Sequence, residues 1–277
     1  MSIAASSSPS SSLRPRVVLA LVRRDFRQAR SYRLALVLDL LFGVANLLVF
    51  FYISRTFTNG AAIDLGGAPS YFAFASVGIV ITLVIGAAST GLAGRIREEQ
   101  LLGTLEALVV QPVSVPELSV GLAAYTFLFA MGRGAFYLLV AGLWLGADFG
   151  ETSWTGLVVI LLAATAAFSS LGGLLGAVVV VVKRGDALIG MVTYTMGILS
   201  GAFFPISVLP DWLEPIGAVL PTRFAFDGLR SAIFEGSGWA GDALVLLVFS
   251  VVTVPIAVWF FGRALALARR AGTLTQY

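Results

Sequence analysis

The chain has 277 residues, of which 58% are hydrophobic and 12% charged, and its net charge is +3. Charged residues approach a quarter of a soluble domain, so this composition excludes an ordinary soluble protein and predicts an integral membrane protein. The sequence has no cysteine and no histidine, which excludes disulfides and removes the commonest general base and metal ligands. We therefore expect no catalytic residue, no metal site and no bound cofactor in this chain.

The N-terminal part is polar and basic. Residues 1–16 are rich in Ser, Pro and Arg and predict a disordered tail. In residues 17–33, a helical wheel separates an apolar arc from a basic arc; the apolar arc holds Val18, Leu19, Val22, Phe26 and Ala29, and the basic arc holds Arg23, Arg24, Arg27 and Arg30. This pattern is typical of an amphipathic helix at a membrane interface, with a simple topogenic charge cluster as the alternative interpretation.

Six apolar segments follow and predict an all-α membrane fold with six transmembrane helices. They cover about 34–53, 71–94, 118–146, 154–182, 187–204 and 243–262, so residues 17–277 are expected to form one transmembrane domain. The fourth segment contains Gly172, Gly173 and Gly176, which suit close helix packing. The fifth is short and rich in hydroxyl side chains.

The distribution of basic residues predicts the orientation of these spans. With both ends of the chain in the cytoplasm, 14 of the 18 basic residues lie on the cytoplasmic side, three lie outside and Arg133 lies within a span. The positive-inside rule favours this arrangement. We expect a multi-pass protein of the cell membrane with cytoplasmic N- and C-termini.

A charged stretch, residues 95–117, separates the second and third spans and must lie in water. It carries Arg95, Arg97, Glu98, Glu99, Gly103, Thr104 and Glu106, followed by Pro112 and Pro116. If residues 100–110 are helical, then Leu101, Leu105, Leu108 and Val109 share one face. The pattern predicts a short amphipathic helix in a cytoplasmic loop, with an ordinary charged surface helix as the alternative.

A proline-rich stretch, residues 205–238, lies between the fifth and sixth spans. Four prolines, Pro205, Pro210, Pro215 and Pro221, alternate there with Trp212, Phe224, Phe226 and Phe234. The stretch is too broken to span a bilayer and too apolar for a free loop, so it predicts an external re-entrant hairpin. We expect two short helices in it, roughly 210–219 and 223–234.

Arg133 is the most costly residue for a membrane protein to hold. It lies about 15 residues into its span, or roughly 22 Å at the helical rise, near the middle of the bilayer. An arginine there costs about 2.5 to 3.5 kcal/mol, so it should face a partner or a wet cavity. Asp39 lies only about 8 Å into the first span by the same count, which argues against a pair between the two. Structural anchoring and a role toward substrate both remain open.

The charged stretch resembles the coupling helix of type-2 ABC (ABC-2) export permeases in its paired acids, its Gly-Thr-Leu-Glu step and its Pro112-Val113-Ser114 continuation. The proline-rich stretch resembles the same family's external hairpin, which ends near a step like Asp227-Gly228-Leu229-Arg230. The resemblance implies coupling to an ATPase subunit through Arg97, Glu98, Glu99, Gly103, Thr104 and Glu106. It also implies a substrate path beneath the hairpin, for which the candidate residues are Arg133, Phe204, Pro205, Phe224 and Phe226.

No phosphate-binding loop of the form G-x-x-x-x-G-K-[ST] is present, because the one lysine, Lys183, is followed by Arg184. ATP must therefore be bound and hydrolysed by a partner. The resemblance implies two ATPase subunits and a second permease copy, as a homodimer in contact with membrane lipid and without nucleic acid. The expected cargo is an amphipathic drug-like compound, lipid or lipid-linked glycan. The alternatives are an intramembrane lipid-modifying enzyme and an ion-coupled carrier, both of which need more intramembrane acids than Asp39.

Overall fold

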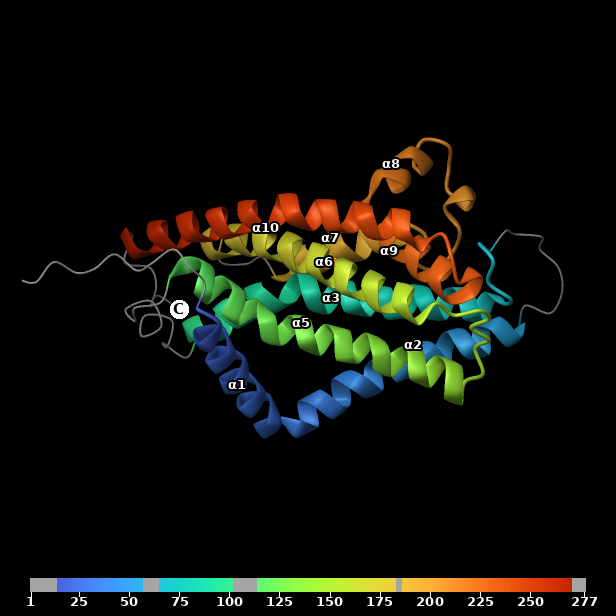
Figure 1. Ribbon diagram of the computed structural model, residues 1–277, viewed down its shortest axis with the longest axis horizontal. Helices are drawn as coiled ribbons and strands as arrows, with labels where there is room; N and C mark the ends of the chain where they lie inside the picture. The colour runs from blue at the N-terminus through green and yellow to red at the C-terminus, as the bar shows by residue number, and fades with distance from the viewer. Residues whose placement is uncertain (1–13, 57–64, 102–113, 183–185, 271–277) are drawn as a thin grey trace, which may run out of the picture.

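The computed structural model describes residues 14–56, 65–101, 114–182 and 186–270, and the elements in them are helical. Four long helices run side by side along the molecule: α3 (Tyr71–Leu101), α5 (Val115–Leu139), α6 (Trp154–Val182) and α10 (Trp239–Arg270). Two further helices, α1 (Pro15–Ser31) and α2 (Arg33–Thr56), form a V beside α5 (Figure 1). A π-helical turn, η1 (Val140–Trp144), extends α5.

Five of the described helices are long and apolar enough to cross a membrane: α2, α3, α5 with η1, α6 and α10. The predicted fifth span is shorter, because α7 (Asp186–Leu199) has 14 residues, or about 21 Å against roughly 30 Å of hydrocarbon. The helix ends before the left-handed turn at Gly201, whose φ is +91°, a conformation that favours glycine. The fold is thus an all-α membrane bundle in which the predicted fifth span is incomplete as a helix.

The core of the bundle lies around α3. Residues 72–81 of this helix are buried continuously, and α3 packs against α5, α6 and α7. Helix α6 also packs along α10. The predicted close packing is confirmed at Gly172, where an added Cβ would overlap with the carbonyl group of Ser89 on α3.

The proline-rich hairpin differs in detail from its prediction. It contains a 3-10 turn, η2 (Ile206–Val208), then α8 (Glu214–Val219), α9 (Pro221–Arg230) and a π-helical turn, η3 (Ser231–Glu235). The first helix of the hairpin was predicted to begin at Pro210, and this start is wrong, since α8 begins at Glu214. A helix from Pro210 would have placed Pro215 in its interior, where proline lacks the N–H donor. Instead, residues 211–213 form turns and Pro215 occupies the first turn of α8.

The charged stretch is helical at both ends. Helix α3 continues to Leu101, so Arg95 and Glu98 lie on the extension of the second span and not in a loop. At the other end, Ser114 and Glu117 form a capping box that starts α5. The predicted coupling helix between these points, residues 102–110, lies outside the described residues, as does most of the tail at 1–16.

Candidate functional site

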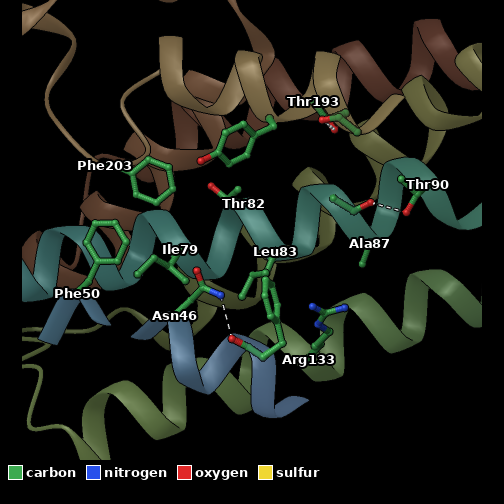
Figure 2. A pocket seen from close by; sticks show the side chains of 14 residues that line it. Asn46, Phe50, Ile79, Thr82, Leu83, Ala87, Thr90, Arg133, Thr193 and Phe203 are labelled. Atoms are coloured by element: carbon green, nitrogen blue, oxygen red, sulfur yellow. Dashed lines mark hydrogen bonds between the residues drawn. The ribbon is translucent and has the colours of Figure 1, made fainter. Parts of the chain in front are cut away.

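A cavity of about 760 Å³ opens between α2, α3 and α7 in the middle of the bundle (Figure 2). We call it the central cavity. Its lining is Phe42, Asn46 and Phe50 of α2, Ile79, Thr82, Leu83, Gly86, Ala87 and Thr90 of α3, Gly190, Thr193 and Tyr194 of α7, and the side chains of Arg133 and Phe203. Residues at every fourth position of α3, Thr82, Gly86 and Thr90, share one helical face toward it.

Aromatic rings form one end of the central cavity. Phe50 stacks on Phe203 with ring centroids 5.2 Å apart and planes at 13°, and Tyr194 lies 6.5 Å from Phe203. Figure 2 shows Phe50 and Phe203 facing one another at the end of the cavity away from Thr90. Phe203 lies two residues before the proline-rich hairpin, so this aromatic end adjoins the start of the hairpin.

The polar groups in the wall are mostly acceptors. The hydroxyls of Thr82, Thr90 and Thr193 each donate 2.8 Å hydrogen bonds to the backbone carbonyl four residues earlier. The amide of Asn46 donates likewise to the carbonyl of Phe42 at 2.9 Å. The three threonine bonds use the hydroxyl protons, so the remaining lone pairs of these oxygens can act only as hydrogen-bond acceptors. The wall is therefore apolar with a few hydrogen-bond acceptors.

Arg133 supplies the one positive charge among the described residues of the lining. Its Nη1 donates to a carboxylate oxygen of Asp39 at 2.8 Å. Its Nε is buried without a hydrogen-bond partner, and its guanidinium lies 5.7 Å from the ring centre of Tyr137. The Tyr137 hydroxyl in turn donates to the backbone carbonyl of Asp39 at 3.1 Å. Arg133 and Tyr137 together hold α2 against α5.

The ion pair corrects the sequence-based expectation that Asp39 lies too far from Arg133. That expectation started both spans at the same level. In the structure, α1 runs from the start of α5 to the corner of the V, so α2 begins beside the middle part of α5 (Figure 1). Close contact at Gly43, where a Cβ would overlap with the Tyr137 ring, fixes the crossing of the two helices. Asp39 thereby reaches the level of Arg133.

The other predicted substrate-path residues lie elsewhere. Phe226 is fully buried in the core, and Phe224 packs partly buried against it. Neither these residues nor Phe204 and Pro205 line the central cavity, whereas the neighbouring Phe203 does. The sequence reasoning missed the face of α3, although Thr82, Gly86 and Thr90 at intervals of four residues were a visible signal.

Arg230 is a second buried arginine, at the end of α9. Its Nη2 donates to the carbonyl of Gly201 at 2.8 Å and more weakly to those of Ala202 and Phe74, at 3.4 and 3.5 Å. Its guanidinium lies 3.5 Å from the ring centre of Phe74. Burial lowers the pKa of Arg230 to about 9, so the side chain stays charged at neutral pH. It joins the hairpin to α3 and to the turn after α7.

Helix α1 contacts both ends of the charged stretch. At the α3 end, Glu98 accepts hydrogen bonds from Gln28 of α1 at 2.6 Å and from Arg95 at 2.8 Å. At the α5 end, Glu117 accepts from Arg14, which caps α1, at 2.7 Å. Of the predicted coupling residues, Glu98 is the one whose side chain is described. Gly103, Thr104 and Glu106 lie outside the described residues, as do the side chains of Arg97 and Glu99.

One comparison with known proteins identifies the family of this chain. The sequence model of a family described as ABC-2 type transporter matches residues 16–234, which include α1 to η3 up to Phe234. No individual curated protein matches the chain significantly. The matched region contains every helix that lines the central cavity and the whole charged stretch.

Proposed function

The chain belongs to the ABC-2 type transporter family, and from this premise we propose that it is the permease subunit of an ATP-driven exporter of amphipathic molecules. Family membership makes it a multi-pass membrane permease of an ABC transporter. The proposal adds the direction of transport, the class of cargo and the partners. A separate ATPase subunit supplies the energy, and two copies of it work with two permeases.

The central cavity is the observation that carries the proposal. Its volume of about 760 Å³ lies in the range of roughly 300–1,000 Å³ typical of sites for small organic ligands. Its walls are aromatic and aliphatic with hydrogen-bond acceptors, and the guanidinium of Arg133 lies at one side. Such a lining suits a molecule with a large apolar part and a polar or anionic group. A drug-like compound, a lipid and a lipid-linked glycan all have this character.

The exposed side chains at the edge of the central cavity support our proposal that a second permease copy packs there. Phe42 on α2 and Tyr194 on α7 line the cavity, yet 62% and 55% of their surfaces are exposed. The cavity is therefore open at the side between these helices. A second copy related by a two-fold axis would present the same two helices and close it. The translocation path would then lie between the two permeases.

The charged stretch supports the ATPase partner. Its two ends are held by α1 through Gln28 and Arg14, so a force applied to the stretch is passed to α1. Helix α1 leads directly into α2, which forms one wall of the central cavity. In this arrangement, ATPase movement at the charged stretch would shift α2 relative to α3 and α7.

Co-expression with an ATPase subunit and reconstitution in vesicles test the proposal. Gly86 lines the central cavity and an added Cβ there meets no atom within 4 Å, so we expect the side chain of Gly86→Leu to extend into the cavity. We expect this variant to lose ATP-dependent efflux of amphipathic dyes at normal membrane levels. Gly241→Leu, at an equally open position on α10 outside the cavity, should retain efflux.

Three results would overturn the proposal. Equal efflux in Gly86→Leu and Gly241→Leu would remove the cavity from the transport path. Efflux that needs no ATPase subunit and follows an ion gradient would favour an ion-coupled carrier instead. Chemical modification of a lipid by the permease alone would favour the intramembrane enzyme.

A further inference from the structure

A groove of about 990 Å³ runs along the inner side of the V formed by α1 and α2, against α5. We call it the V groove. Its walls are apolar and come from all three helices; they include Leu19 and Phe26 of α1, Val37 and Leu40 of α2, and Phe129 and Phe136 of α5. Several of these side chains remain largely exposed, 68% for Leu19 and 63% for Phe26. In the described part of the chain, the groove is an unfilled apolar surface.

Besides Arg133, three arginines line the same groove: Arg23, Arg30 and Arg33. All three are exposed, and within the described residues none of them has a carboxylate partner. The neighbouring Arg24 and Arg14, by contrast, pair with Asp25 and Glu117. The V groove thus combines long apolar walls with unpaired positive charge on α1 and at the first residue of α2.

We propose that the V groove binds an anionic phospholipid as a resident ligand. The acyl chains lie along the apolar walls, and the headgroup phosphate accepts hydrogen bonds from Arg30 and Arg33, with Arg23 nearby. Guanidinium groups suit phosphate oxygens because they offer paired donors. A basic amphipathic helix beside a bilayer also attracts anionic lipid in preference to neutral lipid.

Charge complementarity favours lipid over a protein occupant. In a symmetric contact, a second permease copy would bring its own α1 to the same region, and like charges would face one another. An anionic lipid instead neutralises the three arginines and covers the apolar walls. The site is separate from the central cavity, although Arg133 lines both. The inference therefore does not depend on which cargo the permease carries or whether it exports it.

The headgroup contacts are tested by native mass spectrometry of the purified full-length permease in micelles with equal phosphatidylglycerol and phosphatidylcholine. We expect the parent protein to retain phosphatidylglycerol preferentially. The double variant Arg30→Gln with Arg33→Gln should lose this preference. Arg16→Gln with Arg27→Gln removes the same charge from α1 at positions outside the V groove and should keep it. Equal loss in both double variants would show a diffuse charge effect and overturn the proposal.

The apolar part is tested by filling the groove. An added Cβ at Gly132, which lines the V groove, meets no atom within 4 Å, so Gly132→Leu occupies it while leaving the arginines in place. This variant should retain less of both lipids, whereas Gly86→Leu, in the central cavity, should retain as much as the parent. Unchanged retention in a monodisperse Gly132→Leu protein would refute lipid in the groove. Preferential loss of permease–permease crosslinking in Gly132→Leu, without lipid loss, would instead assign the groove to a second copy.

Discussion

The middle of the bundle and its hairpin end each hold an arginine whose side chain is at most 10% exposed, and the two are held in different ways. Arg133 pairs with the carboxylate of Asp39, whose side chain is 38% exposed, and lies between two cavities. Arg230 is 5% exposed, lines neither cavity, and donates to backbone carbonyls while its guanidinium covers the ring of Phe74. Sequence analysis singled out Arg133 as the costly residue, yet Arg230 is the more deeply buried of the two.

The contrast shows that a costly charge does not by itself mark a functional site. At the hairpin end, main-chain carbonyls of the turn after α7 are without helical partners, and Arg230 satisfies them. Its charge therefore stabilises an irregular, buried stretch of backbone. In the middle of the bundle, the regular helices satisfy their own carbonyls, and Arg133 pairs with a carboxylate instead. Both arginines keep a buried Nε without a hydrogen-bond partner, but Arg133 alone of the two lies in cavity walls. The position beside a cavity, and not the unpartnered Nε, distinguishes the candidate site from the structural anchor.

The largest effect is expected at the hairpin end. Arg230→Leu removes the donor from the carbonyls of Gly201, Ala202 and Phe74, and the buried unsatisfied groups should cost about 3 to 5 kcal/mol. We expect little folded protein in the membrane, measured by its level and by the unfolding temperature in detergent. Arg223→Leu on the same helix, where the side chain is 39% exposed, serves as the control and should lose less than about 1 kcal/mol. Normal levels of Arg230→Leu would contradict the anchoring role.

Two glycines of α3 sharpen the comparison, because the helix passes through both regions. A Cβ at Gly78 would overlap with the carbonyl oxygen of Ala202, beside the Arg230 anchor, whereas a Cβ at Gly86 enters open space. Gly78→Ala should therefore destabilise the protein by about 3 kcal/mol, as overpacking against a backbone does. Gly86→Ala should stabilise it by up to about 1 kcal/mol through helix propensity. Thermal unfolding of both variants in one detergent measures the difference, and equal unfolding temperatures would contradict it.

The spans that depend on apolar length were predicted well from the sequence. Helix α6 matches residues 154–182, and the family resemblance at the charged and proline-rich stretches agrees with the matched family. The predictions that were wrong or missing depended on how the helices are arranged relative to one another. The Arg133–Asp39 pair needs the offset of α2 that α1 imposes. The inward face of α3 is defined by which helices surround it, and the buried state of Phe226 by the packing of α9 on α10 and α6. Counting residues along single helices could not supply these relations.

In the middle of the bundle, the stability effects of removing the charges of Asp39 and Arg133 should be coupled. Asp39→Asn leaves Arg133, with a side chain only 10% exposed, without its carboxylate and should lower stability by about 1 to 2 kcal/mol. The double variant Asp39→Asn with Arg133→Gln should recover part of that loss, because no unpaired charge remains. Transport should stay altered in the double variant if Arg133 faces cargo. Additive stability changes in this double-mutant cycle would show that the pair is not coupled, and Arg133→Leu with unchanged transport would exclude both roles.

The smallest effect on stability is expected at the charged stretch, which belongs to neither arginine's region. The Glu98 side chain is 40% exposed and accepts hydrogen bonds from Arg95 and Gln28. Exposed charge contacts of this kind contribute little, so Glu98→Lys should change stability by about 1 kcal/mol or less. Its effect on coupling should be larger, because the change places a cation between α1 and the stretch that we assign to the ATPase. We expect normal membrane levels but reduced transport-linked ATP hydrolysis in vesicles containing both subunits.

A matched control separates coupling from net charge in this last experiment. Glu235→Lys makes the same charge change at an exposed position of the hairpin end, far along the bundle from α1 (Figure 1), and should leave ATP hydrolysis coupled. Reduced hydrolysis in Glu98→Lys alone would locate the effect at the contact between Gln28 and Glu98. The companion change Gln28→Ala, which removes the α1 side of that contact without altering charge, should then reproduce a weaker form of the defect. Parent-like hydrolysis in both Glu98→Lys and Gln28→Ala would mean that α1 does not transmit the ATPase movement to α2.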